Sequence, residues 1–90
     1  MMNEYHEFSL LAREINYLEQ LARRDGTIAR LLRFQTGERG RTTIRLAREE
    51  AEELRDHLGT QLIMYGFAED YSPNEEGEMI ELLIDKFFIR

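Results

Sequence analysis

Residues 44–66 read IRLAREEAEELRDHLGTQLIMYG, and in them a short strand pattern leads directly into a helix pattern. Its apolar residues recur at intervals of three or four, which is typical of one face of an α-helix. Glutamates crowd the first turns, where the helix dipole favours carboxylates. Gly66 is typical of a C-terminal cap in the left-handed conformation. We therefore expect a helix over residues 48–65, entered from a strand at Ile44-Arg45-Leu46.

A similar arrangement occurs 36 residues earlier in the chain. Residues 8–10 alternate like a strand and precede an amphipathic helix pattern over residues 12–24. Displacing one segment on the other aligns Phe8 with Ile44 and Glu14 with Glu50. The identities are too few to indicate a duplication, but both segments predict a strand that feeds a helix.

Residues 28–35 fit two structures. Ile28, Leu31 and Leu32 fit a helical turn, whereas alternation through Phe34 fits one face of a strand. The polar stretch 36–41 then leads into the β-branched residues 42–44, which favours a hairpin closed by that loop.

The fold expected from these patterns is a single α+β domain over residues 1–90. It has a small two- or three-stranded antiparallel sheet packed with three helices, in the order β-α-β-β-α-α. A nearly all-α bundle is the alternative, and it requires residues 28–35 to be helical.

Residues 70–81 read DYSPNEEGEMIE, and their oxygen-bearing side chains fall nearly at the spacing of a calcium loop. Such a loop needs glycine at its sixth position, where Glu75 stands here. The stretch instead fits a helix start, with Ser72 as N-cap, Pro73 in the first turn and Glu75 closing a capping box. Glycine inside a helix is unfavourable, so Gly77 predicts the close approach of another backbone.

The final helix carries apolar residues around more of its circumference than one side of a small core covers. Exposed apolar surface of this kind is typical of an interface, and small domains gain stability by associating. Symmetric dimers are the commonest oligomers. We expect this helix to mediate self-association through Ile80, Leu83, Ile84, Phe87 and Phe88. The alternative is that the helix is the fully surrounded centre of the core.

Charge is distributed unevenly along the chain, whose net charge is −6. Residues 23–48 carry a net charge of +6 and residues 49–90 a net charge of −9. The basic segment predicts anion or nucleic-acid contacts at Arg30, Arg33, Arg39 and Arg41. The acidic balance of the whole chain disfavours nucleic acid, so the segment can instead pack beside acidic helix faces, within the chain or across a dimer. A further alternative is that the acidic half mimics a nucleic acid.

Residues for catalysis or metal binding are few. The chain has no cysteine, and its two histidines, His6 and His57, lie far apart without a partner at ligand spacing. His57 stands four residues after Glu53, which predicts a weak surface pair. We expect no enzymatic activity, no metal and no cofactor.

The function expected from these observations is a non-catalytic protein–protein interaction module, such as a small regulator, inhibitor or adaptor. We expect it to act as a homodimer, or with another protein partner. No stretch resembles a signal peptide or a membrane span, so we expect a cytoplasmic protein.

Overall fold

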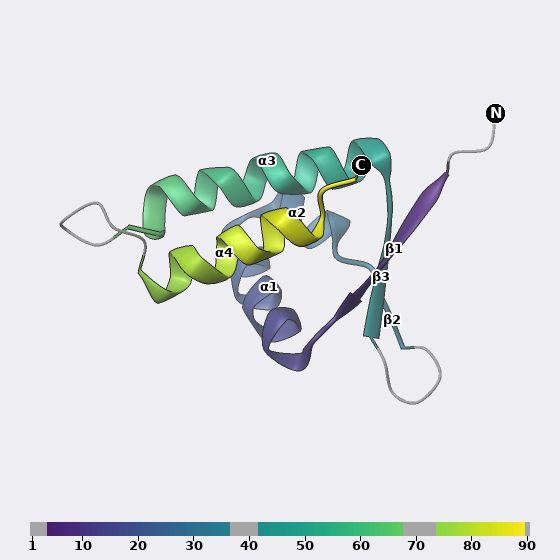
Figure 1. Ribbon diagram of the computed structural model, residues 1–90, viewed down its shortest axis with the longest axis horizontal. Helices are drawn as coiled ribbons and strands as arrows, with labels where there is room; N and C mark the ends of the chain where they lie inside the picture. The colour runs from purple at the N-terminus through teal and green to yellow at the C-terminus, as the bar shows by residue number, and fades with distance from the viewer. Residues whose placement is uncertain (1–3, 37–41, 68–73, 90) are drawn as a thin grey trace.

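The computed structural model describes residues 4–36, 42–67 and 74–89 of the chain. The elements in chain order are β1 (Tyr5–Leu10), α1 (Ala12–Arg24), α2 (Gly26–Leu31), β2 (Phe34–Thr36), β3 (Thr42–Ala47), α3 (Arg48–Tyr65) and α4 (Glu75–Lys86). The strands form an antiparallel sheet in the order β1-β3-β2, and the helices lie to one side of it (Figure 1). The predicted α+β class is confirmed, with the short helix α2 added to the three long ones.

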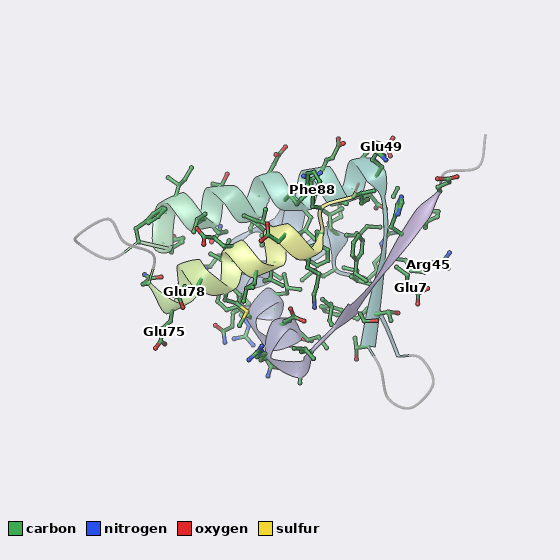
Figure 2. All side chains as sticks on the ribbon, viewed as in Figure 1. Glu7, Arg45, Glu49, Glu75, Glu78 and Phe88 are labelled. Carbon is green, nitrogen blue, oxygen red and sulfur yellow. The ribbon has the colours of Figure 1, made fainter. Side chains whose placement is uncertain are left out.

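One face of the sheet is buried beneath the helices and the other is exposed. Ile44 and Leu46 of β3 are fully buried, whereas Arg45 between them is exposed. This alternation is the period of two that a strand shows when one face of its sheet is packed. Glu7 of β1 is opposite Arg45 in the register of β1 and β3, and both side chains extend away from the helices (Figure 2).

The two strand–helix segments that share a sequence pattern pair with each other in the sheet. Phe8 is opposite Ile44 in the register of β1 and β3. Glu14 and Glu50 each accept a hydrogen bond from the backbone N–H of the residue just before their helix, at 2.8 and 2.9 Å. Each glutamate therefore accepts a hydrogen bond from a backbone amide that has no acceptor within the helix. The two units are built in the same way.

Residues 26–31 form helix α2, which shortens the strand expected between residues 28 and 35. The carboxylate of Asp25 caps this helix and accepts hydrogen bonds from the amides of Thr27 and Ile28, at 2.9 and 3.3 Å. Ile28 and Leu31 are fully buried at helical spacing. The expected hairpin with β3 is present, but only β2 contributes to it.

A continuous hydrophobic core joins the sheet to the helices. Its fully buried members are Leu18, Leu21, Ile28, Leu31, Ile44, Leu46, Ala51, Leu54, Leu58, Ile80, Leu83 and Phe87. The ring of Phe87 contacts the ring of Phe8 edge-on, with 5.1 Å between centroids, so the residue that ends α4 packs against the sheet. In the part of the chain that the structure describes, no helix is long and apolar enough to cross a membrane.

The end of α3 contacts the start of α4 directly. The side-chain oxygen of Asn74 accepts a hydrogen bond from the Gly77 amide at 2.8 Å, so Asn74 is the N-cap of α4. The side-chain amide of Asn74 donates to the carbonyl of Tyr65 at 3.0 Å, and its backbone amide donates to the carbonyl of Gly66 at 2.9 Å. One residue therefore joins the two helix ends.

Two predictions about these helix ends are wrong. The helix begins at Glu75 rather than at Pro73, because Asn74 is as good a cap as Ser72 and its amide adds the bond to α3. Ser72 and Pro73 lie outside the described residues. Gly66 has a φ of −89°, so it is not in the left-handed region. Its lack of a side chain matters because a Cβ there would overlap Leu62 and would lie 3.0 Å from the Cα of Gly77.

Candidate interaction surface

The five residues predicted to form an interface on α4 differ in exposure. Ile80, Leu83 and Phe87 are fully buried within the chain's own core, so the prediction that they contact a partner is corrected. The helix packs beside α3 and over the core, which covers this stripe (Figure 1). Ile84 is half-buried, and Phe88 is 55% exposed.

Phe88 is held at the surface beside α3. The guanidinium of Arg55 lies 4.9 Å from the centroid of the Phe88 ring, within the range of a cation–π contact. Figure 2 shows Phe88 beside α3, past the end of α4. Of the five predicted contact residues, Phe88 is the one that offers a large exposed surface.

Other large apolar side chains are exposed on α4 and at the end of α3. They are Ile63, Met64, Tyr65, Phe67 and Leu82. Leu82 was not among the predicted contact residues, although it is 57% exposed in the middle of α4. The signal for it in the sequence was a second apolar flank of that helix, made of Met79, Leu82, Phe88 and Ile89, which lies outside the stripe that the core covers.

A groove of about 780 Å³ separates α1 from α4. The two helices run antiparallel, since Glu14 pairs with Lys86 at 2.6 Å near one end and Arg24 pairs with Glu76 at 2.5 Å near the other. Between these ion pairs the groove is lined by Arg13, Asn16, Tyr17, Gln20, Arg23, Glu75 and Met79. Most of the lining residues therefore carry a polar or charged group, although their apolar atoms supply much of the exposed surface.

The ion pair between Arg24 and Glu76 is part of a cluster that joins three helices. The guanidinium of Arg24 also lies 4.3 Å from the centroid of the Tyr65 ring on α3. Burial acts to raise the pKa of Glu76, but Arg24 and Tyr17 beside it outweigh that effect and bring the pKa below its ordinary value. Burial and the nearby Glu76 carboxylate raise the pKa of Tyr17, which keeps the phenol neutral.

Two of the four arginines predicted to bind anions are paired within the chain. Arg30 pairs with Glu53 of α3 at 2.6 Å, and Arg33 pairs with Glu50 of the same helix. Arg39 and Arg41 lie outside the described residues. At Arg30 and Arg33 the basic segment thus packs beside an acidic helix face, which was the alternative to a nucleic-acid site.

His57 does not pair with Glu53, contrary to the prediction. Its Nδ1 lies 2.7 Å from the carboxylate of Asp25, while Glu53 is occupied by Arg30. Burial acts to raise the pKa of Asp25, but hydrogen bonds from His57 and from two backbone amides bring it below its ordinary value. His57 therefore supports the cap of α2.

Among the described residues, no group of three His, Asp or Glu side chains is placed to hold a metal ion. In the stretch with calcium-loop spacing, Asn74 caps α4 and Glu76 pairs with Arg24. Asp70 and Ser72 of that stretch lie outside the described residues.

Comparison with models of known protein families, with characterised proteins and with solved structures finds no match to this chain. The candidate site consequently depends on the geometry of the chain alone. That geometry points to the surface formed by the exposed side of α4, the end of α3 and the groove beside α1.

Proposed function

We propose that this protein is a non-catalytic protein–protein interaction module that self-associates through the exposed side of α4. Single exposed apolar residues are normal in a protein surface. Here, however, six of the eight large apolar residues that are exposed in the described chain belong to α4 and the end of α3: Ile63, Met64, Tyr65, Phe67, Leu82 and Phe88. This concentration on one helix pair is the observation that carries the proposal.

Leu82 is the residue on which the proposal depends most. It lies in the middle of α4, whose opposite face supplies Ile80 and Leu83 to the core, so the helix is held rigidly in place. Burying a leucine side chain contributes about 1.5–3 kcal/mol, and a symmetric contact buries it in both copies. Small domains have limited cores, so such a contact adds stability that the single chain lacks.

The proposed role is that of a small regulator, inhibitor or adaptor, which acts as a homodimer or brings this surface to another protein. The lack of cysteine agrees with a reducing compartment, and we include a cytoplasmic location in the proposal.

The test compares the molar mass of the protein with that of two leucine variants by light scattering across a wide concentration range. Leu82→Ala removes an exposed leucine from α4, and Leu11→Ala removes one of matched exposure, 57% against 54%, from the start of α1. We expect the wild type and Leu11→Ala to associate, and Leu82→Ala to associate more weakly. A monomer at every concentration, with Phe88→Ala changing neither association nor solubility, would overturn the proposal.

A further inference from the structure

Two exposed stripes of opposite charge lie on α1 and α4, the helices on either side of the groove. The basic stripe consists of Arg13, Asn16, Gln20 and Arg23 of α1, all of which line the groove. The acidic stripe consists of Glu75, Glu78, Leu82 and Asp85 on the exposed side of α4, and of these Glu75 lines the groove. Within each stripe the residues are three or four apart, so they lie on one side of their helix. Figure 2 shows Glu75 and Glu78 extending outward from the first turns of α4.

Four of the charged residues in these stripes have no ion-pair partner in the part of the chain that the structure describes. Arg13 and Arg23 form no ion pair with any described residue, and the same holds for Glu78 and Asp85. By contrast, Arg24 and Glu76, which also line the groove, form an ion pair with each other. The stripes therefore carry charge that is free to interact with another molecule.

The two stripes have the same length and begin and end at similar positions along the groove. Arg13 and Arg23 are ten residues apart, as are Glu75 and Asp85, which is about 15 Å along a helix. The ion pair between Glu14 and Lys86 places Arg13 beside Asp85 along the length of the two helices. In the same way, the ion pair between Arg24 and Glu76 places Arg23 beside the first turns of α4.

We propose that the occupant of this surface is a second copy of the same chain, related by a two-fold axis that runs along the groove. Rotation about such an axis keeps each residue at the same position along the groove. It places α1 of one copy opposite α4 of the other. The basic stripe of one copy then lies against the acidic stripe of the other, with Arg13 opposite Asp85 of the partner subunit and Arg23 opposite Glu78 of the partner subunit. The contact is self-complementary, as a closed dimer requires.

The apolar side chains of this surface lie between the charged ends. Leu82 lies between Glu78 and Asp85 in the acidic stripe, and Met79, three residues earlier, lines the groove. In the proposed dimer these side chains lie near the axis and are covered by their counterparts, while the ion pairs lie at the two ends. An apolar centre with a charged rim is the usual arrangement of a protein interface.

The inference deepens the proposed function, since it presupposes self-association through α4 and adds which surfaces meet. The test uses two double variants of the full chain, Arg13→Glu with Arg23→Glu, and Glu78→Arg with Asp85→Arg. Each variant alone places like charges opposite each other. When the two are mixed, both contacts of a mixed dimer again join opposite charges.

We expect each double variant alone to associate at least about tenfold more weakly than the wild type at low salt, and the equimolar mixture to recover association. The measurement is sedimentation velocity at low and high salt, because screening should weaken the contact. Circular dichroism of each variant checks that it is folded.

The controls are Arg48→Glu and Glu52→Arg, which each reverse one exposed charge on α3 outside both stripes. They should leave association unchanged. A wild type that dimerises while the double variants dimerise equally well would overturn this inference and leave the proposed function standing. A wild type that stays monomeric would overturn both.

Discussion

The backbones of Gly66 and Gly77 are in direct contact where the end of α3 meets the start of α4. A Cβ on Gly77 would overlap the carbonyl oxygen of Gly66 and would lie 3.2 Å from its Cα. The same carbonyl accepts the Asn74 amide at 2.9 Å, so the position of the oxygen is fixed. This contact sets how closely α4 approaches α3, and it confirms the prediction that another backbone lies against Gly77.

Gly77→Ala should therefore destabilise the protein. Alanine gains about 1 kcal/mol over glycine in a helix interior, but forcing the two backbones apart costs more, so we expect a net loss of about 1–3 kcal/mol. The measurement is the free energy of unfolding from urea denaturation.

Gly59→Ala is the matched control, because Gly59 is also in a helix and a Cβ there would meet no atom within 4 Å. We expect this variant to be more stable than the wild type by up to about 1 kcal/mol. Equal effects of the two substitutions would contradict the close contact at Gly77.

The cap of α4 gives a second prediction. Asn74→Ala removes both the bond to the Gly77 amide and the bond to the Tyr65 carbonyl, and we expect it to cost about 1–2 kcal/mol in unfolding free energy. Asn74→Asp keeps a good cap and loses only the amide donor, so its cost should be smaller. Thermal unfolding of the two variants checks the order, and a larger loss for aspartate would contradict it.

The two sides of α4 should differ sharply in their effect on the stability of the single chain. Leu83 is fully buried, and Leu83→Ala should cost about 2–5 kcal/mol because it leaves a cavity in the core. Leu82→Ala, one residue earlier, should change unfolding by less than about 1 kcal/mol under dilute conditions where association is absent. Urea denaturation at low protein concentration measures both, and similar losses would show that the helix is rotated from its position here.

The Asp25–His57 pair predicts a specific pH dependence. The pKa of Asp25 is lowered in the folded protein, so its carboxylate stabilises the fold above its unfolded pKa of about 4, and this stability is lost as pH falls through the folded pKa. Asp25→Asn keeps the cap but removes the charge, and it should cost about 1 kcal/mol at neutral pH.

The difference in unfolding free energy between Asp25→Asn and the wild type should therefore shrink as pH is lowered from 6 to below about 3. Glu52→Gln, at an exposed position, is the control, and its difference should stay near zero throughout. If the difference in unfolding free energy between Asp25→Asn and the wild type does not change with pH, the role assigned to the Asp25 charge is contradicted.

The long helices near the start and middle of the chain could be predicted from the sequence because their signals are local. Apolar spacing predicts α1, and apolar spacing together with the glutamates in its first turns predicts α3, both with the bounds observed. The antiparallel hairpin with β3 also followed from local signals, namely β-branched residues after a polar loop.

The remaining features depend on contacts between distant parts of the chain. Helix α2 is only six residues long, and it forms because Asp25 caps it and because Ile28 and Leu31 enter the core. The arginine pairs join residues that are 17, 23 and 52 positions apart, which no local pattern encodes. The two apolar flanks of α4 look alike in the sequence, and only the packing decides that the flank with Leu82 stays exposed.

Self-association through the exposed side of α4 would change the molar mass of the wild-type protein in solution. Sedimentation equilibrium at low salt should show a mass that rises with concentration from the 10.7 kDa of one chain toward twice that value. Leu82→Ala should shift this rise to higher concentration. A mass of one chain at every concentration, for the wild type and the variant alike, would contradict the claim.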